Sequence, residues 1–176
     1  MIKVFSFRPE FFNNNGDQGN LEALSHFTRA ELVSAEIEKA DVVLFGDASR
    51  AAMREFENEM QSHVGVIEAR LASGAPTLLI GSSFEYFASR VKGMPTLSYG
   101  ERASEFRTVE AVGLRLRGYR NTELVSPDVF VSGNFVGTTL FGPVLAKNPT
   151  LLERFAKALG LEVQMSAEQR FWIEQL

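Results

Sequence analysis

The sequence has no cysteine and only two histidines, His26 and His63, in 176 residues. The absence of cysteine excludes disulfide bonds, thiolate metal sites and a cysteine nucleophile. Two histidines argue against a histidine-rich metal site and leave few general bases for catalysis. We therefore expect neither a metal site nor a bound cofactor.

Strong positive charge and long apolar runs are also missing. The net charge of −4 and the isoelectric point near 5.3 argue against a nucleic-acid partner, since such proteins normally carry a basic field. No apolar run approaches the length that spans a bilayer, and the first residues lead into an expected strand rather than a signal peptide. The sequence thus predicts a cytoplasmic protein with no nucleic-acid partner and no membrane partner.

What is present is the composition of an ordinary globular domain. Apolar residues make up 45% and charged residues 23% of the chain, which is enough for a hydrophobic core. The 15 Phe residues outnumber the three Tyr and the single Trp, and we expect most of them to pack in that core. A chain of this length predicts one domain over residues 1–176.

Strand and helix patterns alternate in the first half of the chain. Apolar or alternating runs predict strands at residues 2–7, 31–37, 40–45 and 77–80. Three-to-four spacing predicts helices at residues 21–29, 50–73 and 84–91. Asn20 is placed to cap the first helix. This alternation predicts an α/β fold with a largely parallel central sheet and helices on both faces.

The second half of the chain is richer in strands. After an expected loop at 92–100, strands are expected at 107–116, 119–125, 129–131 and 135–140, with a break at Gly118 and a hairpin turn at 132–134. Helices are expected at 149–159 and 166–176. These strands predict antiparallel additions to the parallel sheet.

One stretch has the form of an active-site turn but lacks a reactive side chain. The apolar run 77–80 ends at Gly81, passes through Ser82 and Ser83 and enters a helix. In α/β proteins the carboxyl end of a strand is where chemistry is usually sited. A serine nucleophile needs an activating base, and neither histidine follows an expected strand. The alternative is that the two serines cap the helix.

A polar loop follows the first expected strand. Its Asn, Asp and Gly residues can adopt left-handed backbone conformations and bond to their own backbone. Two interpretations stay open: a simple loop with a helix cap, or a binding loop. The candidate binding residues are Asn15, Asp17, Gln18 and Asn20.

Five segments of the sequence match one known family in order and spacing. They are residues 11–24, 40–46, 76–87, 118–121 and 137–149. Together they resemble the class I glutamine amidotransferase-like proteins of the cobyric acid synthase type. Within that family the chain is most similar to the glutaminase subunit of lipid II isoglutaminyl synthase, which works with a Mur ligase-like partner in cell-wall synthesis. The resemblance implies a single three-layer, flavodoxin-like domain.

The departures from the family pattern fall on its catalytic positions. The resemblance places the catalytic cysteine at Gly81 and the catalytic histidine at Phe141. Glycine cannot attack a substrate and phenylalanine cannot carry a proton, so the resemblance implies no glutaminase activity. Asp47 would bring negative charge to the place where a negative intermediate forms. The expected remains of the site are Gly46, Asp47, Ala48, Ser82, Ser83, Glu85, Asn121 and Thr122.

Three functions remain open at this point. The first is a catalytically inactive binding or regulatory subunit, whose partner is a Mur ligase-like or other ATP-dependent synthetase, or a second copy of the chain. The second is a hydrolase or transferase of changed chemistry that uses Asp47, Ser82, Ser83 and Glu85, or a cation held by the two acids. The third is a sensor that binds an amino acid or amide without turning it over.

Overall fold

The computed structural model describes residues 1–175 and contains a six-stranded sheet in the order β2-β1-β3-β4-β8-β7. The five strands from β2 to β8 are parallel, and β7 at the edge is antiparallel to β8. The parallel strands follow the flavodoxin-like order, in which the chain direction across the sheet reverses between β1 and β3. The strands are β1 (Ile2–Ser6), β2 (Leu32–Ser34), β3 (Val42–Phe45), β4 (Thr77–Ile80), β7 (Val129–Ser132) and β8 (Phe135–Thr138).

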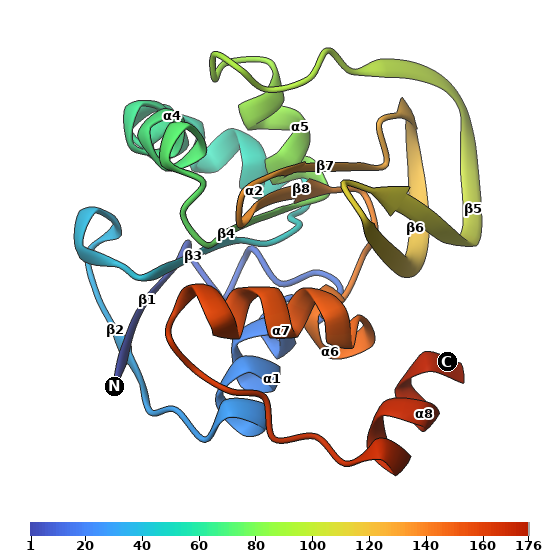
Figure 1. Cartoon of the computed structure of the whole chain (residues 1–176). Helices are drawn as coiled ribbons and strands as arrows, with labels where there is room; N and C mark the ends of the chain where they lie inside the picture. The colour runs from blue at the N-terminus through green and yellow to red at the C-terminus, as the bar shows by residue number, and fades with distance from the viewer. Residues whose placement is uncertain (176) are drawn as a thin grey trace.

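Helices cover both faces of this sheet, as Figure 1 shows. One face carries α1 (Gly19–Thr28), α6 (Val144–Lys147) and α7 (Pro149–Ala158). The other face carries α2 (Arg50–Glu55), α3 (Glu57–Ser62), α4 (Val64–Ser73) and α5 (Ser82–Ala88). A short 3-10 helix, Ile37–Lys39, precedes β3, and α8 (Ala167–Gln175) follows α7. The predicted three-layer α/β architecture is confirmed.

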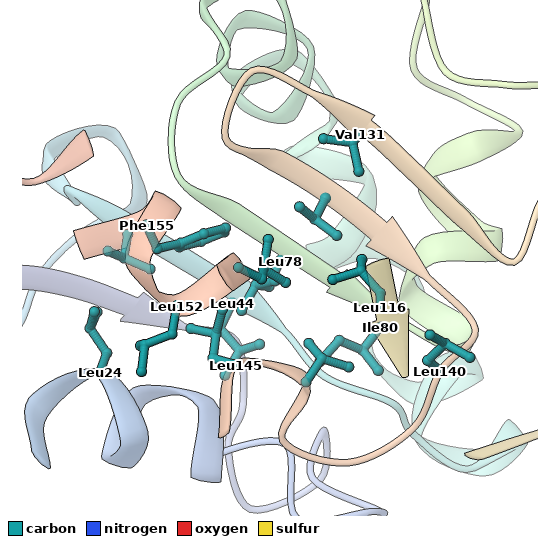
Figure 2. Packing of buried hydrophobic residues seen from close by; sticks show 14 of the residues in the cluster. Leu24, Leu44, Leu78, Ile80, Leu116, Val131, Leu140, Leu145, Leu152 and Phe155 are labelled. Carbon is teal, nitrogen blue, oxygen red and sulfur yellow. The ribbon is translucent and has the colours of Figure 1, made fainter. Parts of the chain in front are cut away.

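The two cores on either side of the sheet follow from alternation along fully buried strands. Successive strand residues point to opposite faces. Leu44, Leu78 and Ile80 therefore pack toward Leu145, Leu152 and Phe155 (Figure 2). Phe45 and Leu79 pack on the other face. Seven Phe residues are among the largest fully buried side chains, which confirms the expected aromatic core.

A long antiparallel hairpin projects from the sheet. It consists of β5 (Ser98–Ala111) and β6 (Leu114–Ser126), and it lies beside the β7–β8 edge in Figure 1. An isolated bridge joins Tyr119 of β6 to Phe141, with Phe141 N donating to Tyr119 O at 2.7 Å. A buried ion pair, 2.9 Å long, joins Arg120 of β6 to Asp128, the residue before β7. The antiparallel additions predicted for the second half are present.

Two predicted boundaries in this part of the chain were wrong. The hairpin turns at Val112 and Gly113, both with positive φ (49° and 73°), and not at Gly118. Gly118 lies inside β6, where a Cβ would come within 2.8 Å of Leu140 Cβ, so a close approach requires glycine there. The stretch 92–100, expected as a loop, already enters β5 at Ser98.

Three other local predictions also differ from the structure. The helix expected at 50–73 is three short helices, with breaks at Phe56 (φ −99°, ψ 12°) and His63 (φ −90°, ψ −6°). The strand expected at 31–37 covers only Leu32–Ser34. Asn20 lies within α1 and is buried, so Gln18 and not Asn20 occupies the cap position. The expected terminal helix is present over Ala167–Gln175, and residue 176 lies outside the described residues.

No helix within residues 1–175 is long and apolar enough to cross a membrane.

Candidate functional site

The turn at the carboxyl end of β4 has unusual backbone geometry. Gly81 has φ 58° and ψ −123°, a combination that side-chain-bearing residues rarely adopt. A Cβ placed on Gly81 would lie 2.4 Å from Asp47 Oδ1 and 2.8 Å from Phe141 Cε1. The space above this turn, where a nucleophile's side chain would begin, is therefore filled by a carboxylate and a phenyl ring.

The Asp47 carboxylate is held in that space by three hydrogen bonds. Its Oδ1 accepts from the backbone N–H of Ser82 at 2.9 Å. Its Oδ2 accepts from Asn15 Nδ2 at 3.1 Å and, more weakly, from Asn14 Nδ2 at 3.4 Å. The N–H that follows a nucleophile at a strand-to-helix turn is the kind of donor that stabilises a reaction oxyanion. In this protein that donor bonds to a negative group of the chain itself.

Ser82 and Ser83 bond across to the loop after β3. Ser82 Oγ accepts from Ala48 N at 2.9 Å, and Ser83 Oγ donates to the carbonyl of Gly46 at 2.7 Å. Neither side chain makes a cap hydrogen bond with α5, so the interpretation of these serines as helix caps was wrong. Their role is to fix the β3 loop, which carries Asp47, against the start of α5.

The polar loop after β1 divides into a buried part and an exposed part. Asp17 is fully buried, and its Oδ2 accepts from Asp47 N at 3.0 Å. Burial raises the pKa of Asp17 to about 7. Asn20, also buried, accepts from Leu145 N at 2.8 Å and so connects α1 to α6. Gln18 donates to Ser6 Oγ at 2.7 Å. Asn15 is exposed, and its side-chain amide donates to the Asp47 carboxylate.

The remaining predicted residues line a pocket of about 350 Å³ between α5 and the hairpin. Glu85 accepts from Tyr99 Oη at 3.1 Å, and Asn121 Oδ1 accepts from Arg102 Nε at 2.8 Å. Burial raises the pKa of the Glu85 carboxyl, and burial beside Glu85 raises the pKa of Tyr99 to about 12. Ser82, Glu85, Asn121 and Thr122 all line this pocket, so the structure brings four predicted residues together.

Six lining residues of that pocket were not predicted: Arg50, Met53, Tyr86, Tyr99, Arg102 and Glu123. Tyr99 lies in the stretch expected as a loop, and Arg102 lies between that loop and the strand expected from residue 107; in the structure both belong to β5. Only the pairing of β5 with β6 brings them opposite α5, because Tyr99 pairs with Leu124 and Ala103 with Thr122. No short sequence motif carries that information.

The described residues offer neither a cluster of metal ligands nor a histidine base for the serines. Within residues 1–175 no group of three or more His, Asp or Glu side chains could hold a metal ion. His63 packs against the rings of Phe5, Phe7 and Phe45, and burial lowers its pKa. His26 packs against Phe27. Neither histidine is a hydrogen-bond partner of Ser82 or Ser83.

The chain is similar in structure to a glutamine amidotransferase from Thermotoga maritima. The TM-score is 0.57 at 18% sequence identity, and the match covers 90% of this chain and 82% of the other. The fold is that of a glutamine amidotransferase. No protein-family model matches the sequence, and no curated protein matches it.

The amidotransferase-like fold accounts for the position of the site. In open α/β sheets, ligands bind beyond the carboxyl ends of the strands near the point where strand order reverses. Asp17 follows β1, Asp47 follows β3 and Gly81 follows β4, so all three lie at that end of the sheet. The site thus lies where folds of this class usually bind ligands, and the residues there are a glycine and hydrogen-bonded acids.

Proposed function

We propose that this chain is a catalytically inactive glutamine amidotransferase-like protein that acts as a binding or regulatory subunit. The observation that carries the proposal is the Asp47 carboxylate, which lies 2.4 Å from the Cβ position of Gly81 and accepts the Ser82 N–H. A glutamine side chain could not approach this turn without displacing both Asp47 and Phe141. Phe141 at this position also argues against a hydrolase or transferase of changed chemistry.

A glutaminase assay tests the absence of catalysis. We expect no ammonia release above background from the wild type with glutamine. The double variant Gly81→Cys with Phe141→His should also be inactive, because Asp47 still occupies the space that the cysteine needs. Adding Asp47→Gly as a third change clears that space and provides the comparison. Ammonia release by the wild type that disappears in Ser82→Ala would refute the proposal.

The partner in this proposal is a Mur ligase-like or other ATP-dependent synthetase, and the complex is cytoplasmic. Apolar side chains on the hairpin support a protein partner: Phe106 is 75% exposed and Tyr99 58%. Phe106 packs against Tyr119, whose backbone carbonyl accepts from Phe141 N. Because Phe141 also contacts the Cβ position of Gly81, this apolar surface lies next to the turn at Gly81. Exposed aromatic residues are enriched at protein interfaces.

Site-specific photo-crosslinking at Phe106 in the native cell tests the partner. We expect an ATP-dependent synthetase to be captured there and not at Glu55, an exposed residue of α2. Capture of a second copy of the chain would instead support a homodimer, which light scattering of the purified protein would confirm. Capture of neither would reject this partner.

A second candidate function is an amino-acid or amide sensor. The pocket between α5 and the hairpin contains side chains of both charges, Arg50 and Arg102 with Glu85 and Glu123, which suits a zwitterion. Glutamine or glutamate should then raise the melting temperature of the wild type and not of Arg102→Met. No shift with any amino acid or amide would exclude the sensor.

A further inference from the structure

Two adjoining pockets lie farther along the hairpin, between β6, the α6–α7 junction and α8. One, of about 380 Å³, is lined mainly by the hairpin and by α8, with Phe106 and Ile173 as its large apolar side chains. The other, of about 490 Å³, is lined by Arg115 and by the start of α7. We call the first pocket the apolar lobe and the second the cationic lobe. Arg117 and Lys147 line both pockets. We call the pair the α8 cleft; each lobe has the size of a small-molecule site.

The α8 cleft concentrates positive charge on a protein whose net charge is −4. Among residues 1–175, Arg115, Arg117 and Lys147 form no ion pair with a carboxylate. Glu174 also lines the cationic lobe, and its carboxylate pairs with Arg170 of its own helix at 3.4 Å. Three like charges gathered in one pocket repel one another, and an anion bound among them would relieve that repulsion.

The strand geometry directs the two arginines into the cleft. Arg115 and Arg117 are two residues apart on β6 and share a face, whereas Leu114 and Leu116 point into the core. Arg117 Nη1 donates to the backbone carbonyl of Glu174. Lys147 Nζ donates to the carbonyl of Phe141 at 3.3 Å, and burial lowers the pKa of Lys147. These donors retain further N–H groups for a ligand.

We propose that the α8 cleft binds an anionic amphiphile, with its phosphate or carboxylate head among Arg115, Arg117 and Lys147 and its apolar body against Phe106 and Ile173. This inference rests on one feature of the cleft: Arg117 and Lys147 line both pockets and so connect the cationic lobe to the apolar lobe. A simple anion would leave the apolar lobe unfilled, and a neutral apolar molecule would leave the cations unpaired. The inference does not rest on the inactivity of the turn at Gly81, because it involves neither Gly81 nor Asp47, and it shares only Phe106 with the proposed partner surface.

The helix over the cleft can move to admit such a ligand. None of the residues of α8 within the described chain is buried. Its polar attachments are few: Arg170 pairs with Glu153 of α7, and Arg117 bonds to the Glu174 carbonyl. An element with little buried apolar surface opens at low free-energy cost. Ile173 would then close on the apolar body of the ligand.

Calorimetric titration of the full chain with decyl phosphate, at low ionic strength and below its micelle concentration, tests the proposal. We expect decyl phosphate to bind saturably. Inorganic phosphate and decanol should each bind with much lower affinity, since each occupies one lobe. Arg117→Met should weaken binding roughly tenfold, the value of one lost charge-assisted hydrogen bond. Phe106→Ser should lower the affinity for decyl phosphate and leave the affinity for inorganic phosphate unchanged. Decanoate replaces decyl phosphate to distinguish a carboxylate head from a phosphate head.

Arg54→Met is the matched control, because Arg54 is an exposed residue of α2 that does not line the cleft. Arg115→Met provides a second test, since Arg115 is exposed and its loss should not affect folding. Absence of binding by the wild type would overturn the proposal. So would decanol binding as tightly as decyl phosphate, or an equal loss of affinity in Arg54→Met and in both cleft variants.

Discussion

Gly81 combines a backbone conformation with a crowded environment, and both require the absence of a side chain. Its φ of 58° is unfavourable for other residues, and the Cβ position is already in contact with Asp47 and Phe141. Backbone strain of this kind costs about 1–3 kcal/mol. Displacement of two hydrogen-bonded or packed neighbours adds to that cost.

Gly81→Ala should therefore lower the free energy of unfolding by roughly 2 kcal/mol or more. Gly65→Ala is the control, because Gly65 lies in α4 with no atom within 4 Å of its Cβ position. That change should raise stability by up to about 1 kcal/mol, as alanine is the better helix former. Urea unfolding of both variants measures the difference; equal effects would show that the turn is not strained.

Asp17 gives the protein a specific dependence of stability on pH. Its folded pKa of about 7 lies above the ordinary carboxyl pKa of 3.8, so the folded state holds the proton more tightly than the unfolded state. The protonated carboxyl makes its full contribution to the free energy of unfolding below about pH 4, and this contribution is lost as the pH rises toward 7. Asp17→Asn keeps an oxygen that can accept the Asp47 N–H.

We expect Asp17→Asn to be more stable than the wild type at pH 8, by up to a few kcal/mol at about 1.4 kcal/mol per pKa unit. At pH 4 the two proteins should be nearly equal. Urea unfolding across pH 4–8 measures the difference between them. A difference that stays constant with pH would show that Asp17 does not titrate in this range.

At the scale of elements, the hairpin depends on a turn that its sequence does not favour. Two-residue turns with positive φ at both positions normally contain Asn-Gly or Asp-Gly. Here the first position is Val112, with φ 49°, and a β-branched residue is strained in that region. The extensive pairing of β5 with β6 holds the turn in place.

Val112→Asn should stabilise the protein by about 0.5–1 kcal/mol, because asparagine tolerates the left-handed region that valine resists. Val125→Asn, an exposed position in the extended part of β6, is the control and should give no gain. Thermal unfolding of the two variants provides the measurement. An equal rise in melting temperature in both would attribute the gain to polarity and not to the turn.

The same hairpin shows where sequence pattern succeeds and where it fails. The buried strands 40–45 and 77–80 could be predicted because uninterrupted apolar runs between turn residues have few other interpretations. The hairpin turn could not, since Val112-Gly113 lacks the usual signal and Gly118 is an equally isolated glycine. The position of Gly81 was accessible to sequence reasoning, whereas the filling of its space by Asp47 depends on hydrogen bonds from Asn15 and Ser82 that no local pattern encodes.

At the scale of the whole molecule, stability is distributed unevenly between the sheet and the chain end. All residues of β3 and β4 are buried, and strands on both sides pair with them. Within the described chain α8 has no buried residue, and Trp172 is 62% exposed. Figure 1 shows α8 apart from the helices that cover the sheet.

Hydrogen exchange should resolve this difference. We expect the amides of α8 to exchange through local opening, at rates far above those of β3 and β4, which should require global unfolding. Mass spectrometry of peptides covering 164–175 and 40–46 measures both. Equal protection of the two segments would show that α8 is an integral part of the folded unit.

The contact between Asp47 and the position above Gly81 also restricts how this sequence can change. A side chain added at residue 81 meets the carboxylate at 2.4 Å, so that substitution is penalised while Asp47 remains. Loss of Asp47 alone leaves Ser82 N–H and the two asparagine amides without their acceptor. Each single step toward a reactive turn is thus unfavourable before the next one can help. A side chain at residue 81 therefore requires a second change at residue 47, and either change made alone lowers stability.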